Sequence, residues 1–230
     1  MNATYFEARQ VQGSIDTPAL PPWFDQFLPR DFNSSILDVG CGLGGMLRAL
    51  KDRGYKNVHG IDNDEGAIRF CVDQNLMVHR YDISKLLHDD FDKFDFIIIN
   101  HVLEHMPKNL IINILSELRL MLRESGLIYI GVPNAQSNVG SYWMYEDFTH
   151  ETIFTSGSLY YVVRKAGFNV IEFLDVDCTA GTGYFTRFAR RFLLRLYGFN
   201  KQFWNKVTRS IYHGPSPIIF SWEIKALIRK

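Results

Sequence analysis

The chain has few cysteines and no long apolar run, and each shortage argues against a class of protein. Its 230 residues include three cysteines, Cys41, Cys71 and Cys178, an odd number without a C-x-x-C spacing. This usage argues against a disulfide framework and a cysteine-based zinc site, and it favours the reducing cytosol. No apolar run reaches the roughly 18 residues that a membrane span needs. The polar residues 1–10 also lack the apolar centre of a secretory signal, so we expect a cytoplasmic protein.

The formal net charge is zero, but basic and acidic residues are unevenly distributed. From Cys178 onward there are ten Lys and Arg residues and one acidic residue, Glu223, so this part carries about +9. The preceding residues therefore carry about −9. We expect the C-terminal part to meet anionic surfaces differently from the rest of the molecule.

Residues 185–196 have the pattern of a basic amphipathic helix. One face is apolar and the other is rich in arginine, the apolar residues being Phe185, Phe188, Ala189, Phe192, Leu193 and Leu196, and the basic ones Arg187, Arg190, Arg191 and Arg195. Two interpretations stay open. The helix packs on the domain as part of a basic lid or insert over residues 178–214, or it makes peripheral contact with an anionic membrane or a lipid-linked substrate.

The pattern of apolar runs predicts an α/β fold in a single domain, residues 1–230, with a proline-rich N-terminal arm over residues 1–33. Predicted strands cover residues 35–39, 58–62, 78–83, 94–99, 127–132, 170–176 and 218–228, and predicted helices cover 46–53, 65–75, 110–122 and 158–166. Alternating strands and helices indicate a mostly parallel sheet between helix layers. Ligands bind such sheets at the carboxyl ends of the strands.

A glycine-rich loop follows the first predicted strand. Gly40, Gly42 and Gly45 satisfy G-x-G-x-x-G, which lets backbone N–H groups at a helix start approach a ligand. Asp62 ends the second strand, 20 residues after Gly42, where a carboxylate can accept both ribose hydroxyls. Asp82, at the end of the third strand, could accept a hydrogen bond from an adenine amino group. Taken singly, each feature also fits an ordinary tight turn or capping residue.

Residues 36–45, ILDVGCGLGG, resemble motif I of the class I S-adenosylmethionine (SAM)-dependent methyltransferases. Residues 61–62, 82–83, 100–106 and 127–134 are similar, in order, to the family's ribose-binding acid, adenine-binding pair, post-strand-four segment with Leu-Glu-His, and fifth strand. The resemblance implies a Rossmann-like seven-stranded sheet, mostly parallel, with the last strand antiparallel between strands five and six and helices on both faces. It implies SAM as the cofactor, bound by Asp38, Gly40, Cys41, Gly42, Gly44, Asp62, Asn63, Asp82, Ile83 and Asn100.

Two other readings stay open. Tyr161 and Lys165 have the Y-x-x-x-K spacing of nicotinamide-dependent dehydrogenases, although an apolar stripe on the same helix indicates that both face away from the core. A SAM-fold protein that serves only as a binding partner is the second. No nucleic-acid partner is expected, because residues 100–103 lack the Asn/Asp-Pro-Pro-Tyr/Phe motif that base-modifying methyltransferases often carry.

Residues 142–155 combine aromatic and acidic side chains, which suit a sugar or another polar cyclic acceptor. If the acceptor is a hydroxyl, a base must take its proton, and histidine is the usual base at neutral pH. The candidates are His150, assisted by Asp147, and then His101 and His105. We expect no metal ion, although a divalent ion held by Asp147, Glu104 and a histidine stays open.

The segment from Asp147 to Phe168 resembles a branch common among bacterial surface-polysaccharide methyltransferases. The shared features are Asp-x-Thr-His at residues 147–150, Phe-Thr at 154–155 and Ala-Gly-Phe at 166–168. The resemblance implies O-methylation of a sugar in a cell-surface glycan or its precursor. A small aromatic or quinone-like acceptor is the alternative, since Leu-Glu-His also occurs in the methyltransferases that act on such metabolites.

Overall fold

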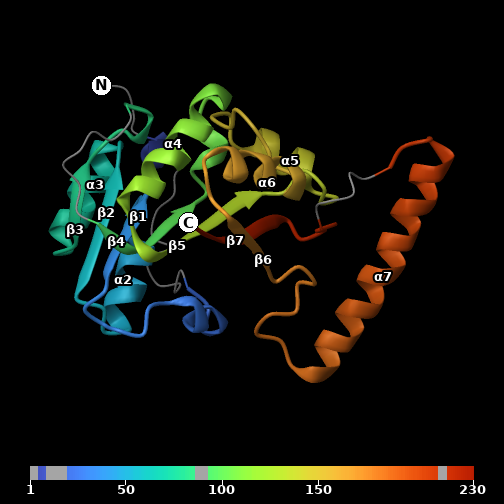
Figure 1. The fold of residues 1–230 in the computed structure, drawn as a ribbon, viewed down its shortest axis with the longest axis horizontal. Helices are drawn as coiled ribbons and strands as arrows, with labels where there is room; N and C mark the ends of the chain where they lie inside the picture. The colour runs from blue at the N-terminus through green and yellow to red at the C-terminus, as the bar shows by residue number, and fades with distance from the viewer. Residues whose placement is uncertain (1–4, 9–19, 86–92, 212–216) are drawn as a thin grey trace.

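A computed structural model describes residues 5–8, 20–85, 93–211 and 217–230. Seven strands form one sheet in the order β3-β2-β1-β4-β5-β7-β6 (Figure 1). The strands are β1 Ser35–Val39, β2 Asn57–Asp62, β3 Met77–Arg80, β4 Phe94–Asn100, β5 Leu122–Pro133, β6 Val170–Leu174 and β7 Glu223–Arg229. All neighbouring strands pair in parallel except β7, which is antiparallel to both β5 and β6. The predicted fold class is confirmed.

Helices cover both faces of the sheet (Figure 1). Their bounds are α1 Tyr5–Ala8, α2 Gly45–Asp52, α3 Glu65–Asp73, α4 Lys108–Met121, α5 Gly140–Glu146, α6 Ser156–Lys165 and α7 Tyr184–Val207, with short 3-10 helices η2 Pro22–Phe27, η3 Ile83–Lys85 and η4 Leu103–His105. The central strands β1 and β4 are buried on both sides, and in β4 every position of residues 96–99 is apolar. Ile97 and Ile99 pack with α4 and α6 on one face, and Phe96 and Ile98 pack with α2 and η2 on the other.

Several predicted strands have different bounds in the structure: β5 begins earlier, at Leu122, β6 ends earlier, at Leu174, and β3 and β7 also differ. β3 ends at Arg80, so Asp82 lies in a turn and Ile83 begins η3, beyond the strand end where the sequence placed them. Ser84 explains the turn, because its backbone N–H and its hydroxyl both donate to Oδ1 of Asp82. β7 begins at Glu223 rather than at residue 218, so residues 218–222 lie before the strand and do not join the sheet.

The basic amphipathic helix is present and longer than predicted. α7 has 24 residues, none of them buried, and it stands apart from the sheet at one side of the molecule (Figure 1). Within the described residues, no helix is both long and apolar enough to cross a membrane. The predicted N-terminal arm and the end of the predicted insert fall partly outside the described residues.

Candidate active site

A cavity of about 650 Å³ opens at the carboxyl ends of β1, β2, β4 and β5. This volume lies within the range of small-molecule and cofactor sites. Three groups of residues line it: the glycine loop with the acids of β2 and η3, the segment after β4, and the segment around α5. They are Val39, Gly40, Gly42, Ile61, Asp62, Asn63, Asp64, Tyr81, Asp82, Ile83, His101, Val102, Glu104, His105, Met106, Pro133, Trp143, Glu146, Asp147, Thr149 and His150, with Tyr5 and Phe6 from α1.

The glycine loop has a backbone that only glycine adopts readily. Gly40 and Gly42 have φ angles of +70° and +49°, in the left-handed region. The Asp62 carboxylate fixes the loop, because Oδ2 accepts the Gly42 N–H at 2.8 Å and Oδ1 accepts the Asp64 N–H at 2.8 Å. Each oxygen keeps a further lone pair for a ligand. A carboxylate beside side-chain-free backbone fits the ribose and amino-acid portion of SAM.

The structure brings six of the ten predicted cofactor residues to the cavity wall: Gly40, Gly42, Asp62, Asn63, Asp82 and Ile83. Asp38, Cys41, Gly44 and Asn100 are not among the described residues that line it.

Packing explains the position of these four residues. The Asn100 side chain lies against Gly131, where a Cβ would come within 2.0 Å of Asn100 Oδ1. A Cβ on Gly44 would come within 2.4 Å of Leu76, so this glycine permits close packing of the loop on α3 and its following turn. Cys41 and Asp38 are buried behind the loop, and burial raises the pKa of Asp38 well above its ordinary value, with a further contribution from Asp62.

Two aromatic residues of α1 lie against the glycine loop and the turn after β2, and they were not predicted. The Phe6 ring approaches Gly42 so closely that a Cβ there would lie 2.9 Å from it. The backbone N–H of Tyr5 donates to Asp64, and its hydroxyl makes a short hydrogen bond to Oδ2 of Asp147. These contacts join residues 59 and 142 positions apart, so no local pattern could have found them.

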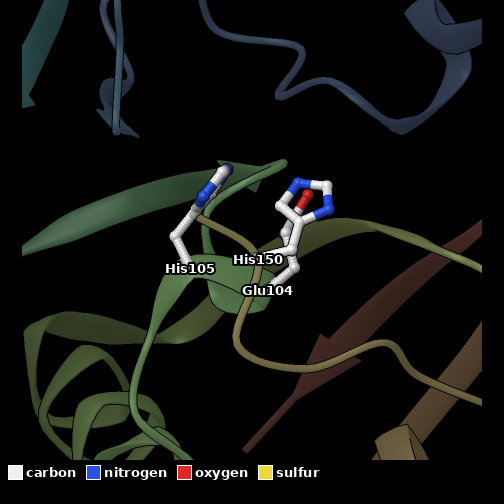
Figure 2. Close-up of side chains that lie close together, drawn as sticks. All are labelled: Glu104, His105 and His150. Atoms are coloured by element: carbon white, nitrogen blue, oxygen red, sulfur yellow. The ribbon is translucent and has the colours of Figure 1, made fainter. Parts of the chain in front are cut away.

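Three polar side chains meet beside the glycine loop, those of Glu104, His105 and His150. Figure 2 shows the three side chains on the same side of the backbone segments that carry them. Their potential ligand atoms lie within 4.8 Å of one another. Glu104 is fully buried, and within the described part of the chain its Oε2 has no hydrogen-bond partner. The structure therefore places Glu104, His105 and His150 close together, whereas Asp147 stands outside this cluster.

Hydrogen bonds fix the tautomers of both histidines. The Thr149 hydroxyl donates to Asp147 at 2.7 Å, so it accepts from Nδ1 of His105 at 2.8 Å. Nδ1 of His150 donates to the Trp143 carbonyl at 2.7 Å, because a carbonyl can only accept. Each neutral ring therefore carries its lone pair on Nε2. Burial lowers the pKa of His105 below its ordinary value, which favours that neutral form.

His101 has the opposite character. Its Nδ1 lies 3.1 Å from Glu104 Oε1 and its Nε2 lies 3.2 Å from Glu223 Oε2, while its ring stacks on Trp222. Burial alone would lower the His101 pKa, but hydrogen bonds to the two carboxylates outweigh it and raise the pKa to about 9. A protonated ring with both N–H groups engaged has no lone pair to accept a proton. This geometry does not suit His101 to act as a base.

Two chemistries fit the cluster of Glu104, His105 and His150. One carboxylate and two imidazoles are ligands that several transition metals accept. The same lone pairs can instead accept a proton at neutral pH. Tyr161 and Lys165 lie on α6 and are not among the described cavity residues, so the dehydrogenase pair is away from the site.

A family described as a methyltransferase domain matches residues 9–173. A SAM-dependent methyltransferase from Archaeoglobus fulgidus is 22% identical, with 90% of this chain and 91% of that one covered and a TM-score of 0.63. One from Mesorhizobium loti is 14% identical, with 91% and 96% covered and a TM-score of 0.60. The plantazolicin methyltransferase BamL, solved with a triazolic desmethylPZN analog and SAH, is 20% identical, with 90% and 80% covered and a TM-score of 0.55. None of the curated proteins compared matches the chain.

The family match spans the glycine loop, the acids at the strand ends and the cluster after β4, and it ends within β6. The matched family is one of methyltransferases and not of nicotinamide-dependent dehydrogenases. The chain belongs to the methyltransferase-domain family, and it shares its fold with solved SAM-dependent methyltransferases.

Proposed function

We propose that this methyltransferase transfers its methyl group to a sugar hydroxyl of a cell-surface glycan or of its precursor. The supporting observation is the pair of imidazoles, His105 and His150, beside the glycine loop, each held by its Nδ1 hydrogen bond in the tautomer that leaves Nε2 to accept a proton. A hydroxyl acceptor must lose a proton as its oxygen bonds to the methyl carbon, and the pair provides a place for that proton.

His150 is the proposed general base, as the sequence suggested. SAM supplies a methyl group already activated on a sulfonium. As the acceptor oxygen bonds to the methyl carbon and the S–CH3 bond breaks to release S-adenosylhomocysteine, the hydroxyl proton would pass to Nε2 of His150. The Trp143 carbonyl keeps the ring aligned through Nδ1, and the buried Glu104 stabilises the imidazolium charge. Asp147 contributes indirectly, because it orients Thr149, which orients His105.

The proposed cofactor subsite is formed by the glycine loop, Asp62 and Asp82. Asp62 would accept the ribose hydroxyls, and Asp82 with Ile83 would face the adenine. Asp38, Cys41, Gly44 and Asn100 would act by supporting the loop from behind. Asn63 completes the proposed wall beside Asp62.

The acceptor side of the cavity supports a polar ring. Trp143 and Glu146 of α5 line it, and the positively charged His101 lies at its edge with Trp222 stacked behind. An aromatic face with charged hydrogen-bonding groups suits a sugar, whose ring has apolar C–H faces and a hydroxyl rim. Tyr5, Phe6 and Met106 also line the cavity, and they favour the alternative of a small aromatic or quinone-like metabolite.

A panel of acceptors distinguishes the two classes. Purified protein with methyl-labelled SAM is incubated separately with nucleotide sugars, lipid-linked sugars, catechols and hydroquinones. Methyl transfer to a sugar, lost in His150→Ala and kept in His79→Ala, supports the proposal, since His79 is a β3 histidine that is not among the cavity residues. Transfer to the catechol or hydroquinone alone replaces the sugar with the aromatic acceptor.

A further inference from the structure

α7 exposes a large apolar surface that the described domain does not cover. Its 24 residues include none that are buried, although many are aromatic or aliphatic. The exposed apolar residues are Tyr184, Phe185, Phe188, Phe192, Leu193, Leu196, Phe199, Phe203, Trp204 and Val207. A contiguous apolar surface of this extent is unusual on a monomeric protein and marks an interaction site.

A separate face of α7 contacts the domain. The half-buried residues follow helical spacing and form one stripe: Leu194, Tyr197, Gly198, Lys201 and Asn205. Within this stripe the Tyr197 ring packs edge-on against Phe220 at 4.8 Å, and a Cβ on Gly198 would lie 3.5 Å from the same ring. At the helix start, Arg191 pairs with Asp177 at 2.6 Å. The helix is therefore attached through one face.

At 3.6 residues per turn, most of the exposed apolar residues lie on the side of α7 opposite this stripe, and Tyr184, Leu193 and Trp204 lie at the edges of that side. Phe185, Phe192, Leu196, Phe199 and Phe203 follow one another at spacings of seven, four, three and four residues, which keeps them in one row. Phe185 is 86% exposed and Phe199 is 73% exposed. The apolar row consequently points away from the domain along the length of the helix.

The charges of α7 have one sign. The helix contains no acidic residue, and its basic residues are Arg187, Arg190, Arg191, Arg195, Lys201 and Lys206. At 3.6 residues per turn, Arg195 and Lys206 both lie along one edge of the apolar row. This arrangement is typical of helices that lie in the interface of a membrane, where apolar residues enter the acyl boundary and basic side chains reach anionic headgroups.

We propose that the outward face of α7 binds the surface of an anionic phospholipid membrane, with the helix lying parallel to the bilayer plane. Charge favours this occupant over a second copy of the chain. Two α7 helices packed face to face would bring basic flanks together without an acidic partner on either helix. An anionic lipid surface supplies the complementary charge and accepts the aromatic row at the same time.

This proposal extends the proposed function, on which it partly rests. A lipid-linked sugar acceptor resides at a membrane surface, and a helix anchored there would hold the cavity near it. Membrane binding itself needs neither the cofactor nor an acceptor. The two proposals can therefore fail separately.

The test is cosedimentation of the full chain with vesicles of phosphatidylcholine, either pure or mixed with phosphatidylglycerol. We expect binding to the mixed vesicles to exceed binding to pure phosphatidylcholine by roughly tenfold or more, and to fall as salt is raised. The double substitution Phe192→Glu with Phe199→Glu should abolish it. The matched control, Val72→Glu with Leu120→Glu, places the same charges at positions that are 55% and 56% exposed elsewhere, and it should lose no more than its added negative charge explains.

Further measurements distinguish membrane binding by α7 from a fold defect and from binding to a second copy of the chain. Circular dichroism and SAM binding should be unchanged in the α7 variant, because the substituted side chains point away from the domain. Equal binding by the α7 variant and the control would overturn the proposal, as would no binding to mixed vesicles. A dimer in solution that the α7 substitutions dissociate would also overturn it and assign the face to a second copy.

Discussion

Asp62→Asn should weaken SAM binding by about 10- to 150-fold. The two carboxylate oxygens accept the N–H groups of Gly42 and Asp64, both at 2.8 Å. The amide keeps one acceptor but turns its NH2 group toward the other N–H, and both groups are donors. Losing one hydrogen bond to a charged acceptor costs about 1.5–3 kcal/mol, which corresponds to that range of affinity.

Isothermal titration of SAM into the variant and the parent protein measures the difference. Asp73→Asn, on the exposed end of α3, is the control for removing one negative charge, and it should bind SAM as the parent does. Thermal unfolding without ligand checks that the loop still folds. Equal affinity in Asp62→Asn and the parent would refute the assignment of this carboxylate to the cofactor subsite.

Three further outcomes follow from the same geometry. His150→Ala should lower kcat by roughly 10²–10⁴ and leave the SAM Kd unchanged, and full activity would remove His150 as the base. Because the His101 pKa is raised in the folded protein to about 9, its ion pairs add stability below the unfolded pKa of about 6.5, and that stability is lost as pH rises through 9. Denaturant unfolding should show this loss in the parent and not in His101→Gln. Chelation of divalent ions with EDTA should leave turnover unchanged, whereas a loss that Mn²⁺ or Zn²⁺ restores would assign Glu104, His105 and His150 to a metal site.

The glycine loop was predictable because its signals are local. The glycine spacing, the acid ending β2 and the apolar strands each depend on residues close together in the chain. The sequence placed Asp82 at the end of β3, but in the structure it lies in the turn after that strand. The hydrogen bond from Ser84 to Asp82 forms this turn, and β3 ends at Arg80. The periodicity of α7 was equally readable, but which of its faces meets the domain depends on Phe220 beyond the helix.

The electrostatics of the site were not predictable from the sequence. His101 and His150 are both histidines near strand ends, yet their chemistry differs. His101 is protonated because Glu223, 122 residues away, reaches its second nitrogen. The Trp143 carbonyl accepts from Nδ1 of His150, so the neutral ring has its lone pair on Nε2. Only the fold decides which histidine meets a carboxylate and which meets a carbonyl.

The most direct test of the account is to follow a labelled methyl group. Purified protein is incubated with methyl-labelled SAM and fractionated bacterial extract, and the label is measured in glycan, glycolipid, small-molecule, protein and nucleic-acid pools. We predict label in the glycan or glycolipid pool, attached to a sugar oxygen, and absent with His150→Ala. Label confined to apolar small molecules, proteins or nucleic acids, or no label despite measurable SAM binding, would contradict it.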